Sequence, residues 1–98
     1  MTKETQHTIL VYMEVQRKID FYYKLQKITT YHELTVTPTA VISAKAEYAL
    51  NTVLDVSYKP FSSQAGILYL HTNQGVFAFY IQSSPQKFID TFRSFKIG

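Results

Sequence analysis

The chain has 98 residues, with 10 Lys and Arg against 7 Asp and Glu, a net charge of +3 and no cysteine. This length gives a single domain over residues 1–98 with its own core, and the missing cysteine excludes disulfides, thiolate catalysis and cysteine-ligated zinc. The charge favours anionic partners weakly and is lower than a dedicated nucleic-acid binder usually carries. The longest apolar run, Ile9 to Met13, is far too short for a membrane span. We therefore expect a soluble cytoplasmic protein, peripheral at the membrane at most, without a transmembrane segment, cofactor or metal.

The first quarter of the chain is open to two interpretations. Residues 1–7 are polar, and we expect them to be flexible. Residues 8–28 contain good helix formers, but their apolar residues spread around the whole helical wheel and form no face. With a period of two, residues 9–15 and 19–25 each show one apolar side. The pattern favours two strands joined at Gln16-Arg17-Lys18 over one helix, although this connection contains no Gly, Asn or Pro.

Three further strands are predicted in the middle of the chain. Residues 31–37 alternate, with Leu34 and Val36 on one side, and Pro38 ends that strand. Residues 41–50 read as one long strand with one buried face, and residues 54–59 read as another, with Leu54 and Val56 on its apolar side. Residues 61–66 have the composition of a loop.

The last third of the chain predicts a hairpin and a closing helix. Residues 67–72 and 76–81 are rich in β-branched and aromatic residues, and Gly75 between them suits a turn that needs positive φ. Ser84 and Pro85 then predict the start of a helix over residues 84–96. The helix carries an apolar stripe that must lie on a sheet, formed by Phe88, Ile89, Phe92 and Phe95. The fold class is therefore mainly β (α+β), with about seven strands and one C-terminal helix.

No group of residues indicates an enzyme. His7, His32 and His71 have no partner at metal-ligand or catalytic spacing, and the three glycines form no phosphate-binding loop. We predict a non-enzymatic protein with no catalytic, cofactor-binding or metal-binding residues.

The residues with functional content form a basic cluster around Phe21-Tyr22-Tyr23. We predict that this cluster binds an anion or a partner, through Arg17, Lys18, Tyr22, Lys24 and Lys27. If the first two strands pair, Arg17 and Lys18 lie at the loop tip, and Lys18, Tyr22 and Lys24 share an outward face. Such a patch suits a phosphate head group or an acidic peptide. The competing interpretation is the solvated face of an amphipathic strand, whose lysines discourage edge-to-edge pairing.

Seven strands followed by one amphipathic helix resemble the pleckstrin-homology (PH) superfold. The segments Tyr48 to Val56, Gly66 to Phe79 and Pro85 to Ile89 look like those of small bacterial PH-like domains. The resemblance implies a bent antiparallel sheet or open barrel, closed at one corner by the helix, with Phe92 in place of the usual tryptophan. It also implies a binding or scaffolding module whose relatives contact phosphoinositides or peptides through the first loop, here Gln16-Arg17-Lys18.

From these observations we expect a module that contacts a protein partner or an anionic lipid surface. The contact is expected at the basic loop, or at the groove between the second half of the sheet and the closing helix. The alternative is a single-stranded nucleic-acid-binding β-barrel, in which Tyr22 and Tyr23 stack on bases beside Lys24. Homo-oligomerisation stays open.

Overall fold

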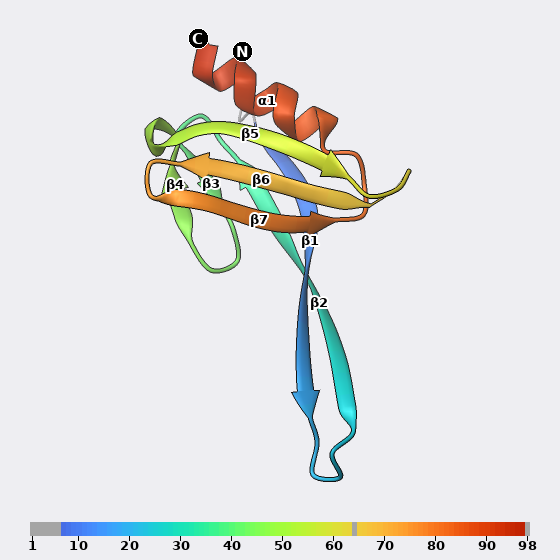
Figure 1. Ribbon diagram of the computed structural model, residues 1–98. Coiled ribbons are helices and arrows are strands. Elements are labelled where there is room, and N and C mark those ends of the chain that lie inside the picture. Colours follow the sequence, from blue (N-terminus) through green and yellow to red (C-terminus); the bar gives the residue numbers. More distant parts are fainter. Residues whose placement is uncertain (1–6, 64, 98) are drawn as a thin grey trace.

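The computed structural model describes residues 7–63 and 65–97. The fold is mainly β: seven antiparallel strands form one sheet, and one helix follows at the C-terminus (Figure 1). The strands are β1 (Thr8–Ile19), β2 (Leu25–Val36), β3 (Ala40–Ile42), β4 (Glu47–Ala49), β5 (Val53–Pro60), β6 (Gly66–Thr72) and β7 (Gly75–Ile81). A 3-10 turn, η1 (Leu50–Thr52), precedes β5, and the helix α1 spans Gln86–Ile97. The flexible segment predicted for residues 1–7 lies, apart from His7, outside the described residues.

The sheet is open and folds over on itself. Its strand order is β4-β3-β2-β1-β7-β6-β5, so β4 and β5 are its two edges. β1 joins the two halves, because it pairs with β2 along its whole length but with β7 only at Tyr12↔Ile81 and Met13↔Tyr80. The strands β5 to β7 then cross over β1 and β2, and α1 lies along the end of the layers (Figure 1).

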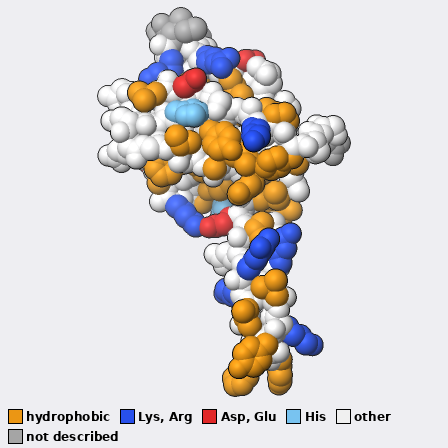
Figure 2. Space-filling view, in the orientation of Figure 1, with side chains coloured by type: hydrophobic (Ala, Val, Ile, Leu, Met, Phe, Trp, Pro, Cys, Tyr) orange, Lys and Arg blue, Asp and Glu red, His pale blue; other side chains and the backbone are white. Residues whose placement is uncertain are grey.

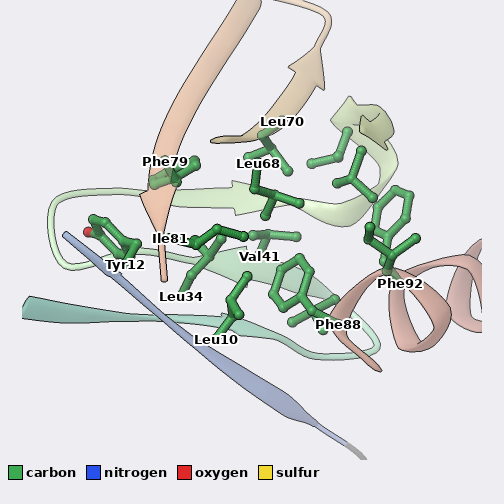
Figure 3. Packing of buried hydrophobic residues seen from close by; sticks show 14 of the residues in the cluster. Leu10, Tyr12, Leu34, Val41, Leu68, Leu70, Phe79, Ile81, Phe88 and Phe92 are labelled. Atoms are coloured by element: carbon green, nitrogen blue, oxygen red, sulfur yellow. The ribbon is translucent and has the colours of Figure 1, made fainter. Parts of the chain in front are cut away.

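The core fills the space between the two halves of the sheet and α1. Leu34, Val41 and Leu68 are fully buried, and Phe88 and Phe92 of α1 point in among them (Figure 3). This confirms the apolar stripe predicted for the helix. The Ser84 hydroxyl accepts a hydrogen bond from the Gln86 amide at 3.3 Å, as a cap at this helix start should.

The count of seven strands was predicted, but two of its members were assigned wrongly. The strand expected over residues 19–25 does not exist, since β1 runs on to Ile19 and Asp20 to Lys24 form the turn. The helix considered for residues 8–28 is absent as well. The single strand expected over residues 41–50 is instead β3 and β4, joined by a turn in which the Ser43 hydroxyl accepts a hydrogen bond from the Ala46 amide at 3.0 Å.

Smaller differences have local causes. The register of β5 shifts between Val53 and Asp55, so Leu54, expected on the apolar side, is 64% exposed while Val53 and Val56 are buried. The C-terminal hairpin matches its prediction, and Gly75 has a φ of 135°, which explains the glycine there. The helix covers Gln86–Ile97 rather than residues 84–96, because Ser84 and Pro85 precede its first turn.

Candidate functional site

The longest feature of the fold is a two-stranded arm that leaves the body. Beyond Met13, β1 pairs only with β2, and the residue pairs from Glu14↔Thr30 to Ile19↔Leu25 carry the hairpin outward. We call residues 14–30 the arm and residues 19–25 its tip. Six strand pairs at about 3.3 Å per residue extend the arm by roughly 20 Å before the turn. The molecule is accordingly elongated, with extents of 58 × 28 × 27 Å (Figure 1).

The tip exposes large apolar side chains. Phe21 is 93% exposed and Tyr23 is 90% exposed, and the other large tip residues, Ile19, Tyr22 and Leu25, are also mostly exposed. Hydrophobic side chains therefore cover the end of the arm, with lysine and arginine side chains behind them (Figure 2). A contiguous apolar surface at the end of a projection is typical of a contact site rather than of a solvated loop.

The turn at the tip is closed by Asp20. Its carboxylate oxygen Oδ1 accepts hydrogen bonds from the Tyr22 amide at 2.8 Å and the Lys24 amide at 2.9 Å. The Asp20 carbonyl accepts a third bond, from the Tyr23 amide at 3.1 Å, and the Asp20 amide donates to the Lys24 carbonyl at 2.9 Å. An aspartate that bonds its own following backbone replaces the glycine or asparagine usually found at hairpin turns. Several backbone amides of the tip therefore have hydrogen-bond partners within the turn and do not need water as an acceptor.

Tyr23 adopts a left-handed backbone conformation. Its φ is 62°, and it is the only non-glycine residue with positive φ among those the structure describes. A side chain with a Cβ pays of order 1 kcal/mol to occupy this region, which asparagine and glycine enter more easily. A tyrosine at this position is therefore not explained by the stability of the turn.

The predicted site residues all lie on the arm, but not in the predicted arrangement. Arg17 and Lys18 are in β1, not at the loop tip, because the strand continues past them. Arg17 lies directly opposite Lys27 in β2, and Lys18 lies opposite Gln26 on the other face. Tyr22 and Lys24 are in the turn, so the outward face predicted for Lys18, Tyr22 and Lys24 does not exist.

The arm carries four cations, Arg17, Lys18, Lys24 and Lys27. Among the residues that the structure describes, no carboxylate forms an ion pair with Arg17, Lys18, Lys24 or Lys27. Like charges directly opposite on paired strands are destabilising, so Arg17 and Lys27 lower the stability of the hairpin that carries them. An anion between them would relieve this repulsion.

The sequence did not point to four apolar residues of the tip, which its period assigned to one apolar side of a strand: Ile19, Phe21, Tyr23 and Leu25. Asp20 was the available signal, because aspartate favours turns that bond to the backbone two residues on. The absence of Gly, Asn and Pro around it concealed the turn.

An ionic cluster lies where the arm joins the body. The Glu14 carboxylate forms an ion pair with Lys45 of the β3–β4 turn and lies 3.2 Å from His32 Nε2. Lys45 lowers the pKa of Glu14, with His32 acting in the same direction, and Glu14 in turn raises the pKa of Lys45. Burial raises the pKa of the nearby Tyr48 phenol, with a smaller contribution from Tyr12. This cluster holds the base of the arm against the body.

Two other places on the molecule bear on the predictions. Ser57 Oγ lies 2.8 Å from His71 Nε2 on β5 and β6, and Asp55 is the register partner of His71. These residues line neither the hollow beside Tyr12 and Tyr48 nor the one beside α1. The hollow beside α1, near Leu50 and Phe95, lies between the end of the helix and the loop after β2, not against the second half of the sheet. Within residues 7–63 and 65–97, no three His, Asp or Glu side chains are grouped to hold a metal.

The comparisons with known proteins give no family: no protein-family model, curated protein or solved structure matches this chain. In the described part of the chain, no helix has the length and hydropathy needed to cross a membrane.

Proposed function

We propose that this protein is a non-enzymatic, PH-like binding module that contacts an anionic membrane surface with the tip of its arm. The observation that carries the proposal is the exposed aromatic tip beside four cations that form no ion pair within the described residues, Arg17, Lys18, Lys24 and Lys27. The resemblance to bacterial PH-like domains is supported by the seven antiparallel strands followed by one helix. A peripheral position on the cytoplasmic face of a membrane belongs to the same proposal.

The order of side chains along the arm matches the layers of a lipid surface. Aromatic side chains favour the interface between water and acyl chains, and the tip presents Phe21, Tyr22 and Tyr23 there. Arg17 and Lys27 lie two residues behind Ile19 and Leu25 on the same face of the hairpin, at the level where head-group phosphates would meet them. The apolar and ionic contacts would form together.

The backbone of the turn lowers the cost of this contact. Amides leaving water for an interface must keep hydrogen-bond partners, and those of Tyr22, Tyr23 and Lys24 are already bonded to Asp20. Tyr23 retains a strained backbone where asparagine would be easier, which is consistent with selection for an aromatic side chain.

Sedimentation with lipid vesicles tests the proposal. The protein should bind phosphatidylserine-containing vesicles at low salt, bind less as salt screens its cations, and bind neutral vesicles weakly. Replacing both Arg17 and Lys27 by glutamine should weaken partitioning by about thirtyfold, because each charge contributes about 1 kcal/mol, or roughly fivefold. Phe21→Ser should weaken binding to anionic vesicles in salt that screens the charges.

Matched controls come from the body of the protein. Lys59→Gln removes an exposed lysine of β5, and Leu54→Ser removes a side chain that is 64% exposed, neither of them on the arm. Both should leave vesicle binding unchanged. Equal loss in the control and arm variants, or no binding to anionic vesicles at low salt, overturns the proposal. Salt-sensitive binding of a labelled oligonucleotide without vesicle binding would favour the nucleic-acid alternative.

A further inference from the structure

Strand β7 has an open hydrogen-bonding edge in the middle of the molecule. It pairs with β6 over its whole length, but with β1 only at Tyr80 and Ile81. Because β1 leaves for the arm after Met13, residues 75–79 of β7 have a register partner on one side only in the described part of the chain. Their alternate amides and carbonyls face the position that β1 vacates.

This edge lacks the protection that the outer edges of the sheet carry. β5 contains Asp55, Lys59 and Pro60 and an irregular register, and β4 is three residues long with Glu47 at its start. Charges, proline, bulges and short length are the devices that keep edge strands from pairing with other chains. β7 reads Gly-Val-Phe-Ala-Phe-Tyr-Ile, with no charge and no proline. The open edge of β7 is thus the least protected of the three.

A groove runs beside the open edge. It has a volume of about 310 Å³, and its walls come from β1 and the β3–β4 region on one side and from β7 on the other. Tyr48 and Phe77 face each other across it with ring centres 5.1 Å apart. The Tyr12 hydroxyl accepts a hydrogen bond from the Ala44 amide at 3.1 Å, which fixes the β3–β4 turn as the far wall. We call this space the β7 groove.

The walls and charges limit what the groove accepts. A single extended segment needs only the width of one strand beside β7. At its end nearest the arm the groove is lined by Glu14 and Lys45, which pair with each other. Arg17 and Lys18, which form no ion pair within the described residues, follow three and four residues further along β1. This favours a segment with acidic residues at that end.

We propose that the β7 groove binds an extended segment of a partner protein by strand addition, antiparallel to residues 75–79, with apolar side chains at alternate positions and acidic residues toward the arm. Main-chain hydrogen bonds would supply affinity, and the aromatic wall that Tyr48 and Phe77 form together would favour an apolar side chain against it. The site is separate from the tip residues that meet lipid in the proposed function.

The probe is a synthetic peptide of about eight residues, acetyl-EEVTVTVT-amide, which combines strand-forming residues with an acidic end. Binding is followed by amide chemical shifts and by hydrogen exchange of the intact protein. We expect slower exchange for amides within residues 75–79, and weaker binding of the acetyl-KKVTVTVT-amide peptide. Methylating the peptide backbone on alternate residues should abolish binding for one of the two alternations only.

Two variants of β7 separate the groove from the rest of the strand. Phe77→Lys places a charge in the groove and should weaken peptide binding by about tenfold or more. Val76→Lys places the same charge on a 58% exposed neighbour outside the groove and should change binding by about twofold at most. Neither should affect vesicle binding, so this test and that of the proposed function can fail independently.

Each of three results would overturn the inference. They are no binding of either peptide, binding unchanged by both methylation patterns, and equal loss in the Phe77 and Val76 variants. Protection of residues 75–79 that grows with protein concentration in the absence of peptide would also overturn it, because the occupant would then be a second copy of the chain.

Discussion

Arg17 and Lys27 lie directly opposite each other across the β1–β2 hairpin, with no acidic partner among the described residues. Their repulsion costs stability in an element that has little packing to offset it, since almost every residue from 15 to 31 is exposed. The same pair would hold a phosphate group between two cations. The arm thus contains a local conflict between its own stability and its proposed contact.

Lys27→Glu should make the arm more stable and weaken its binding to anionic vesicles. The change replaces a repulsive cross-strand pair with an attractive one, worth about 0.2–1 kcal/mol. Hydrogen exchange of the arm amides should slow, while binding to anionic vesicles should fall sharply. Lys59→Glu in β5 is the control, because it changes the net charge equally without touching the arm. If both variants lose the same binding, only net charge matters and the specific role of the arm is wrong.

Tyr23→Asn should separate turn stability from binding. Asparagine tolerates a φ of 62° better than tyrosine, so the turn should gain of order 1 kcal/mol or less. Vesicle binding should weaken, because one of the exposed aromatic side chains is lost. Tyr22→Asn is the matched control, since Tyr22 has no positive φ and should lose binding without the gain. The measurement is hydrogen exchange of the arm amides by NMR. An equal change in the two variants would contradict this interpretation.

Phe88→Ala should strongly destabilise the fold. The side chain is 1% exposed and lies between the two halves of the sheet (Figure 3), so truncation leaves a cavity and costs about 3–5 kcal/mol. That is a large share of the total free energy of unfolding expected for a domain of this size. Urea unfolding measures the loss. Phe61→Ala, at a position 58% exposed, should change the midpoint little; a comparable loss there would mean that the helix contact is not what holds the core.

Acid should weaken the junction between arm and body. Lys45 lowers the pKa of Glu14 below its ordinary value of 4.5, so the ion pair contributes stability above that pH and loses it as the pH falls through the lowered pKa. The carboxyl carbon of Glu14, followed by NMR, should titrate below 4.5. In Lys45→Met the titration should move back up, and His32→Gln should move it less. A midpoint unaffected by Lys45→Met would show that the pair does not form in solution.

Local sequence signals were sufficient for elements that a short stretch of chain specifies by its own turn residues and apolar spacing. The hairpin of β6 and β7 and the helix with Phe88 and Phe92 were predicted nearly as they occur, because turn chemistry and apolar spacing agree there. The turns after Ile19 and Ile42 were missed because Asp20 and Ser43 side chains close them without glycine or proline. One predicted strand, over residues 19–25, does not exist, and another, over residues 41–50, is two strands. The number of strands was therefore correct although these assignments were wrong.

The candidate site shows the same division. The five predicted residues, Arg17, Lys18, Tyr22, Lys24 and Lys27, all lie on the arm, but their apolar neighbours were assigned to one side of a strand. Alternation with a period of two shows that four residues can share a face, namely Ile19, Phe21, Tyr23 and Leu25. It does not show whether another layer covers that face.

By itself the sequence determined a mainly β chain with a closing helix, because alternation, turn residues and helix spacing are local properties. Only the tertiary structure decided that β1 leaves β7 after Met13. That departure makes an exposed arm from residues that look like core and opens the edge of β7, and it depends on contacts between segments more than 60 residues apart, which local patterns do not encode.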